Sequence, residues 1–403
     1  MISRRKLLKI LSSLPLGGFL WGTLGEAGYS FDKIKTGYRD FYKELGLRTF
    51  INAKGTYTAL TGSLMRKETK EAIIQSSHQY VNLNELQDAV GRRLAEMGRS
   101  ESAMVTAGAA SALTLGTAAV ITGTDEEKIR RLPNLPGPRR EVIIQKSHRF
   151  SYDHAVRNTG VKLVEVESRR ELEQAINERT VMMMFLNYDN YEGQIQDEEF
   201  VAFGKKFGIP TFNDCAADLP PVENLWKYNE MGFDLVTFSG GKGLRGPQSA
   251  GLLFGRSDLI EAAKLNAPPH GDTIGRGMKV NKEEIIGMMV ALEEFLEIDH
   301  DRHMKELEDR VRHIQEYADR VPGVRTEVYV PKIANHTPTL KVEWDQSKLN
   351  ITPQEVQQSL RDGHPSIEVR ATDESIQITM WMARPGQERV VARRLQEVME
   401  NAA

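Results

Sequence analysis

Short apolar runs alternate with longer stretches of helical spacing through the middle of the chain. The runs that read as buried strands cover 141–145, 162–166, 181–187, 207–214, 234–239 and a last run that ends at Gly255. Between most of them, apolar residues recur every three or four positions, as in amphipathic helices. Strands that alternate with helices at this spacing form a mainly parallel sheet with right-handed crossovers. The pattern therefore predicts an α/β fold.

The pattern changes in the last third of the chain. A helical period extends over roughly 282–317 with many charges on its outer side. Three strand-like runs then alternate with two helical stretches, at 324–330, 337–344 and 374–382 for the strands and 352–362 and 387–400 for the helices. This order predicts a small C-terminal α+β domain.

The segment DLVTFSGGKGLRGPQSAGLLFG, residues 234–255, joins two apolar strands through a glycine-rich turn. Four glycines and a proline follow Ser239 up to Pro247, so helix or strand is excluded there and Lys242 lies in a tight loop. Burial against a sheet disfavours the charged form of a lysine and frees its amine as a nucleophile towards an aldehyde. A solvated lysine on a surface turn is the alternative.

Two further segments add groups that such a lysine could work with. The strand in FGIPTFNDCAAD ends at Asp214, at the edge of the sheet where open α/β folds bind their ligands. The uncharged, alanine-rich run 102–123 predicts a buried helix, whose first turn from Thr106 to Ser111 offers hydroxyls, N–H groups and a helix dipole to an anion. A lysine, a carboxylate and an anion site are what an enzyme dependent on pyridoxal phosphate (PLP) requires.

Composition narrows the choice of partners. The 403 residues carry 53 basic and 56 acidic side chains, so no basic surface is expected and nucleic-acid binding is not predicted. Cys215 is the single cysteine and cannot form an intramolecular disulfide. The sequence DHDRH at 299–303 could place His300 and His303 on one helix face, but no third ligand is evident, so no metal site is predicted.

The N-terminus has the order of an export signal. A basic start with Arg4 and Arg5 precedes a modestly apolar stretch from Ile10 to Leu24 and small residues around Ala27. The run SRRKLLK resembles the twin-arginine motif, which predicts a signal peptide over 1–28, use of the twin-arginine export machinery and a periplasmic or otherwise exported location. An uncleaved membrane-anchoring N-terminus or a cytoplasmic protein is the alternative.

The lysine loop SGGKGLRGPQSAG resembles that of fold-type I PLP-dependent enzymes, most closely the selenocysteine synthase-like group. This group includes L-seryl-tRNA(Sec) selenium transferases and D-glucosaminate-6-phosphate ammonia-lyases. The resemblance implies a large domain with a mostly parallel seven-stranded sheet, a small C-terminal α+β domain and a homodimer. Together with the predicted signal at 1–28, this gives an N-terminal segment at 29–65, a PLP-binding domain at 66–280, and a linking helix with the small domain at 281–403.

The same resemblance implies roles for individual residues. Lys242 forms the Schiff base with PLP and Asp214 pairs with the pyridine nitrogen. The other implied cofactor contacts are Thr106, Gly108, Ala109, Ser111 and Ser239 for the phosphate, His148 for ring stacking with Tyr152 as second choice, and Arg276 towards the neighbouring subunit's cofactor. Asn52 and Thr56 are candidates for substrate contact, and Arg370 for the substrate carboxylate with Arg384 as competitor. The alternatives are a plain connecting loop for Asn52 and Thr56, a structural histidine for His148 and a solvated arginine for Arg276.

The implied chemistry is a change at Cα or Cβ of an amino acid or amino sugar acid. A β-eliminating ammonia-lyase leads, with aminotransferase and racemase as alternatives. Selenium transfer to seryl-tRNA fits less well, because a tRNA substrate calls for a basic surface. A catalytically inactive periplasmic binding protein is a further alternative, although the presence of both Lys242 and Asp214 argues against it.

Overall fold

The computed structural model describes residues 39–402 and divides the chain into two units, Met1–Thr49 and Phe50–Ala403. In the first unit, Asp40 caps the short helix α2, Phe41–Glu44, by accepting from the Lys43 N–H at 3.1 Å. The predicted export signal lies outside the described residues and stays a prediction. Among residues 39–402, no helix is both long enough and apolar enough to span a membrane.

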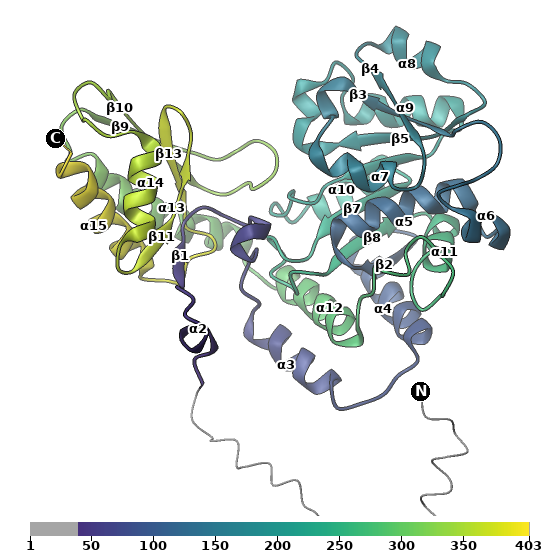
Figure 1. Ribbon diagram of the computed structural model, residues 1–403, viewed down its shortest axis with the longest axis horizontal. Coiled ribbons are helices and arrows are strands. Elements are labelled where there is room, and N and C mark those ends of the chain that lie inside the picture. The colour runs from purple at the N-terminus through teal and green to yellow at the C-terminus, as the bar shows by residue number, and fades with distance from the viewer. Residues whose placement is uncertain (1–38, 403) are drawn as a thin grey trace, which may run out of the picture. The chain divides into compact units, whose positions relative to one another are not determined.

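A seven-stranded sheet forms the core of the larger part of the second unit (Figure 1). Its order is β2-β8-β7-β6-β5-β3-β4, and β3 to β7 run parallel while β8 is antiparallel to both of its neighbours. The strands are β2 Ser102–Thr106, β3 Glu141–Gln145, β4 Lys162–Val166, β5 Thr180–Leu186, β6 Thr211–Asp214, β7 Leu235–Ser239 and β8 Gly251–Gly255. The predicted seven-stranded, mostly parallel sheet is confirmed.

Helices cover both faces of this sheet, because successive side chains of each buried strand point to opposite sides. One face packs on α4 Leu83–Gly98, α9 Asp197–Phe207, α10 Asn224–Met231 and α12 Lys282–Leu296. The other packs on α5 Gly108–Thr122, α7 His154–Arg157 and α11 Ser257–Leu265. The remaining elements of this part are α3 Lys67–Ser76, α6 Glu126–Arg131, α8 Arg169–Ala175 and 3₁₀ turns at Thr58–Leu60, Lys146–His148, Ser151–Asp153 and Asn187–Glu192.

Helix α5 lies unusually close to the sheet. A Cβ atom at Gly116 would come within 2.5 Å of the Phe212 ring, so this helix position requires glycine. The alanine-rich run was correctly predicted as a buried helix, but its first five residues form strand β2. The apolar pattern alone did not separate the two, since both elements are uncharged and buried.

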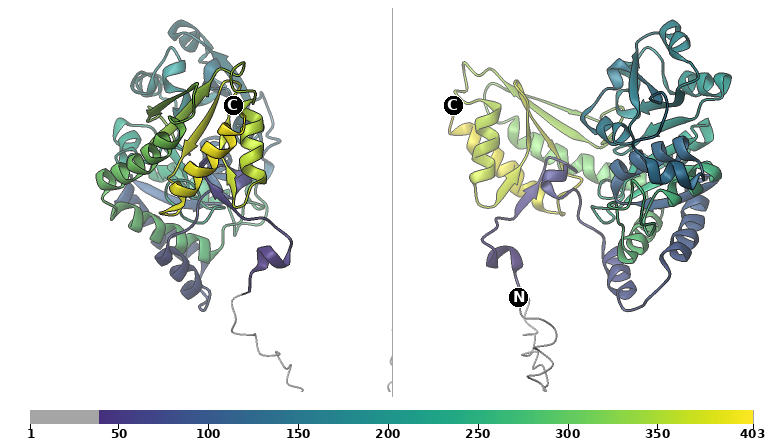
Figure 2. Two further views of the ribbon diagram at one scale, coloured as in Figure 1. Left: turned by 90° about the vertical axis from the view of Figure 1, so that its left-hand side faces the viewer. Right: turned by 45° about the vertical axis from the view of Figure 1, so that its right-hand side comes forward.

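The C-terminal part contains a four-stranded antiparallel sheet in the order β12-β13-β10-β9. Its strands are β9 Val324–Tyr329, β10 Thr339–Trp344, β12 Arg370–Ala371 and β13 Ser375–Thr379, and they pack with α13 His300–Ala318, α14 Pro353–Asp362 and α15 Gln387–Glu400 (Figure 2). A two-stranded parallel sheet joins β1, Phe50–Asn52, to β11, Ser366–Glu368. The start of the second unit is therefore built into its C-terminal part.

The long helix predicted over 282–317 is two helices. It breaks after Leu296, and Asp299 caps the new helix α13 by accepting from the Arg302 N–H at 3.0 Å. Apolar residues of α12 belong to the core of the large sheet, whereas those of α13 belong to the core of the C-terminal part. The break redirects the chain from one core to the other.

Candidate active site

Close backbone contacts fix the loop that carries Lys242. The Gly240 N–H donates to the Ala250 carbonyl at 2.9 Å, and the Gly246 N–H donates to the Gly240 carbonyl at 2.8 Å. A Cβ atom at Gly243 would lie 2.0 Å from the Leu219 carbonyl oxygen, so only glycine fits beside the lysine. The loop is therefore held in place by the sheet on both sides.

Lys242 reaches from this loop into a cavity of about 500 Å³. Burial lowers the pKa of its ammonium group, while the negative charges of Asp214 and Asp218 partly oppose that shift. The lowered pKa increases the fraction of free amine, which is the nucleophilic form. The sequence predicts a lysine buried against a sheet, and in the structure the Lys242 residue is half-buried.

Asp214 ends strand β6 and is almost fully buried, at 5% exposed. Its Oδ1 accepts from the Ala216 N–H at 3.0 Å, and burial raises its pKa against the opposing effects of that bond and of Lys242. An uncompensated carboxylate in such a place is costly. A positively charged ligand group beside it, such as a pyridinium, would favour its ionised form.

Asp218 is a second buried carboxyl group that the sequence analysis did not single out. Its Oδ2 accepts from Asn187 Nδ2 at 3.1 Å, and the same nitrogen donates to the Tyr228 hydroxyl at 2.7 Å. Burial, followed by the negative charge of Asp214, raises the pKa of Asp218 to about 7. Its position four residues after a strand-end aspartate was a weak signal, because nothing in the sequence showed that the chain turns back there.

Asp218 should make the stability of the cofactor-free protein depend on pH. The folded state retains a proton that the unfolded chain releases near pH 4, so stability is full below about pH 4 and falls as pH rises towards about 7. The loss from this group is on the order of 4 kcal/mol. Urea unfolding at several pH values should show that the free energy of unfolding falls less steeply with pH in Asp218→Asn. In the exposed control Asp258→Asn, it should fall as steeply as in the wild type. Equal slopes in wild type and Asp218→Asn would contradict this.

The first turn of α5 has the features of an anion site. Ala107 at its N-cap provides no side-chain cap, and Gly108 and Ala109 are only partly buried, so their N–H groups are open to a ligand. The Thr106 hydroxyl donates to the Gly108 carbonyl at 2.9 Å and the Ser111 hydroxyl donates to the Ala107 carbonyl at 2.7 Å. These two side chains shape the turn, and its backbone is left to bind a phosphate.

Ser239 and β8 adjoin this turn. Ser239 pairs with Gly251, and a Cβ atom on Gly251 would lie 2.6 Å from the Ala109 nitrogen. The end of the lysine-bearing strand thus lies one strand from the helix N-terminus. The lysine, the buried carboxylates and the anion turn lie at the same edge of the sheet, and this set of groups fits PLP.

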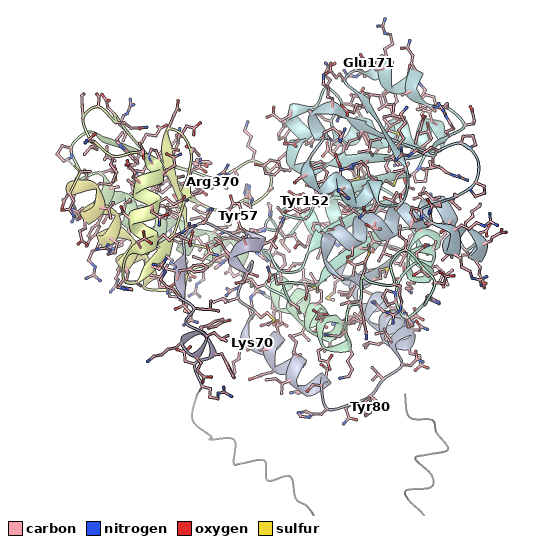
Figure 3. The ribbon with its side chains drawn as sticks, viewed as in Figure 1. Tyr57, Lys70, Tyr80, Tyr152, Glu171 and Arg370 are labelled. Atoms are coloured by element: carbon pink, nitrogen blue, oxygen red, sulfur yellow. The ribbon has the colours of Figure 1, made fainter. Side chains whose placement is uncertain are left out.

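The cavity draws its walls from several parts of the chain. Thr56, Tyr57, Tyr152 and Arg370 line it together with Lys242, and Figure 3 labels the two tyrosines and the arginine. Thr56 and Arg370 therefore share the cavity with Lys242, and their contact with a substrate stays a prediction. The competitor Arg384 is not among the lining residues, and its backbone carbonyl accepts from Arg310 instead.

Three candidate residues have other surroundings. His148 is 0% exposed, with its ring edge-on to Phe185 at 4.5 Å between centroids, so it has no free face for a cofactor, whereas the second choice, Tyr152, lines the cavity. Asn52 uses its side chain within its own loop, donating to the Gly55 carbonyl and accepting from the Lys54 and Gly55 N–H groups, which replaces the expected substrate contact. Arg276 is exposed and lies outside the cavity.

Solved structures share this fold. The structure of a D-glucosaminate-6-phosphate ammonia-lyase matches with a TM-score of 0.77 at 25% identity, covering 90% of this chain and 99% of that chain. A serine palmitoyltransferase that holds PLP matches with a TM-score of 0.57 at 13% identity over 88% of both chains. The predicted fold-type I architecture is confirmed.

Relatives in sequence agree with the structures. A D-glucosaminate-6-phosphate ammonia lyase of Salmonella typhimurium is 27% identical, over 90% of this chain and 99% of the relative. A 5'-C-glycyluridine monooxygenase-decarboxylase of a Streptomyces species is 26% identical, over 89% and 92%. An L-seryl-tRNA(Sec) selenium transferase of Aquifex aeolicus is 23% identical, over 88% and 84%. The model of the L-seryl-tRNA selenium transferase family matches residues 50–348. The chain is therefore a member of the L-seryl-tRNA selenium transferase family.

Proposed function

We propose that this enzyme uses PLP to eliminate a β-substituent from a hydroxylated amino acid or amino sugar acid, with release of ammonia. The observation that carries the proposal is that Lys242, which lines the cavity and whose pKa burial lowers, lies close enough to the buried carboxyl groups of Asp214 and Asp218 for their charges to act on it. The two carboxyl groups themselves are not among the residues that line the cavity. The bound cofactor would supply an electron sink for the substrate's Cα.

The groups of the candidate site have separate tasks in this proposal. The Lys242 amine attaches the cofactor and afterwards moves a proton at Cα. Asp214 holds a positive ring nitrogen by charge, and the first turn of α5 with Ser239 binds the phosphate. Tyr152 covers the ring, and Arg370 holds the substrate carboxylate through its planar fork of donors.

β-Elimination is favoured over the alternatives by the relatives. The ammonia lyase matches this chain over nearly all of its own length, and its name gives an amino sugar acid as substrate. Selenium transfer to seryl-tRNA is less favoured because the net charge of −3 provides no basic surface for RNA. Aminotransfer and racemisation use the same groups and are separated from elimination by their products.

The test is to incubate the PLP-loaded protein with hydroxylated amino acids and amino sugar acids and to measure products. Elimination gives ammonia and a keto acid in equal amounts without any added keto acid acceptor. Aminotransfer needs an acceptor, and racemisation releases no ammonia. A protein that binds PLP and yields neither product from any member of the panel would refute the proposed elimination.

We also propose a homodimer in which the exposed Arg276 reaches the neighbouring subunit's cofactor. Exposed apolar side chains at Ile74, Tyr80 and Val81 are consistent with a covered surface (Tyr80 is labelled in Figure 3).

Export through the twin-arginine route is proposed from Arg4 and Arg5. Changing both arginines to lysine should keep the protein in the cytoplasm, as fractionation would show, and unaltered export would exclude this route.

A further inference from the structure

Trp381 presents an unused hydrogen-bond donor to the candidate active site. It follows strand β13, is 6% exposed and lines the same cavity as Lys242. Among the described residues, its indole Nε1 is buried and has no hydrogen-bond partner. Indole nitrogen is a donor only, so the group that satisfies it must be an acceptor such as a hydroxyl or carboxylate oxygen.

Trp344, at the end of strand β10 in the C-terminal part, has the hydrogen-bond partner that Trp381 lacks. It too is 6% exposed, but its Nε1 donates to the Ile351 carbonyl at 2.8 Å. A buried donor without a partner lowers stability, and native proteins keep few of them. The difference between two equally buried tryptophans points to a ligand for Trp381.

Arg310 fixes the backbone around Trp381 through several hydrogen bonds. Arg310 donates to the carbonyls of Met380 at 3.1 Å, Ala383 at 3.1 Å and Arg384 at 2.7 Å, and it pairs with Glu388 at 3.0 Å. These bonds bracket Trp381 on both sides along the chain. Gly55 lies beside the indole, since a Cβ atom built there would be 3.6 Å from Nε1, an ordinary contact distance.

The wall next to Trp381 carries hydroxyl groups. Thr56, Thr337 and Thr379 line the cavity here, and the hydroxyls of Thr337 and Thr379 lie 3.3 Å apart. Arg370 pairs with Gln377 across the sheet, whereas Trp381 lies two residues beyond the end of the same strand, so the two donors occupy different positions on the cavity wall. A ligand that uses both donors therefore needs a second oxygen in addition to its carboxylate.

We propose that the Trp381 indole N–H binds an oxygen on the substrate chain beyond Cβ and makes the enzyme select polyhydroxylated amino acids over plain ones. The proposal rests on the proposed function for the position of the carboxylate at Arg370. It adds a specificity residue and narrows the proposed substrates to amino acids with a hydroxylated chain of several carbons.

The test compares two ligands that differ only in chain hydroxyls. 2-Amino-2-deoxy-D-gluconate and D-norleucine have the same six-carbon chain and Cα configuration, and titration calorimetry on PLP-loaded protein measures their affinities. We expect wild type to prefer the hydroxylated ligand by about tenfold or more, and Trp381→Phe to lose about tenfold for that ligand and under about twofold for D-norleucine.

Trp344→Phe is the matched control. It removes an indole N–H from the same sheet, should leave both affinities unchanged, and should lower Tm more than Trp381→Phe because it leaves the Ile351 carbonyl unpaired. Equal losses for both ligands in Trp381→Phe, or a larger loss of Tm than in Trp344→Phe, would identify Trp381 as a structural residue and overturn the proposal.

The two proposals fail in different ways. Absence of ammonia and keto acid together with a preserved ligand preference would refute elimination and leave the role of Trp381 intact. Elimination with no preference between the two ligands would refute the role of Trp381 and leave the lyase intact.

Discussion

Changing Lys242 to alanine is expected to give a colourless protein in which borohydride fixes no PLP. The variant loses the amine that attaches the cofactor and the group that carries the proton, so activity should fall by roughly 10³-fold or more. Absorbance of the purified protein and mass spectrometry after reduction measure the two effects. Because Lys242 lies in a loop held by glycine contacts and backbone bonds, its truncation should leave the fold intact.

Lys54 provides the matched control for this change. It is another lysine of the same cavity, with its Nζ 5.2 Å from the centre of the Tyr57 ring. Lys54→Ala should stay yellow and should still carry reduced PLP on Lys242. A reduced adduct in Lys242→Ala, or loss of the adduct in Lys54→Ala, would show that Lys242 is not the lysine that holds the cofactor.

The second large effect is expected from Asp214→Asn. The amide oxygen can still accept from the Ala216 N–H, so the geometry is kept while the negative charge is removed. Without that charge a ring nitrogen beside it loses its proton, and the rate should fall by roughly 10² to 10³-fold. Cofactor affinity should change much less, because Lys242 and the α5 turn are untouched.

Asp218→Asn separates the two buried carboxyl groups. If Asp214 pairs with the ring nitrogen, the Asp218 variant should keep most of its activity, because at neutral pH Asp218 is already partly protonated. Steady-state rates and the cofactor's absorption spectrum should then change strongly only in Asp214→Asn. The opposite order of effects would move the pairing role to Asp218.

The sequence predicted the parts of the site that follow from local pattern. The strand, glycine loop and strand around Lys242 and the strand end at Asp214 have apolar runs and glycines that admit little else. The fold was also recoverable, since six of the seven sheet strands are separate apolar runs. Strand β2 was missed because no charged residue separates it from helix α5.

What sequence could not supply was the direction and surroundings of single side chains. His148 and Asn52 were expected to contact the cofactor and the substrate. In the structure, His148 packs against Phe185, and the Asn52 side chain hydrogen-bonds within its own loop. Asp218 and Trp381 come into view only when segments far apart in the chain are brought together, which places Trp381 in the cavity with Lys242 and brings the charge of Asp218 near that lysine. Such long-range packing has no local signature in a single sequence.

The pairing of β1 with β11 has a consequence for the order in which the protein matures. The two strands are more than 300 residues apart, and the cavity takes Gly55 and Thr56 from just after the first and Trp381 from after the second. During synthesis on the ribosome, the opening segment must wait for nearly the whole polypeptide before it finds its partner. Nascent chains that stop short of residue 366 can build the large sheet, but they leave β1 as an exposed edge.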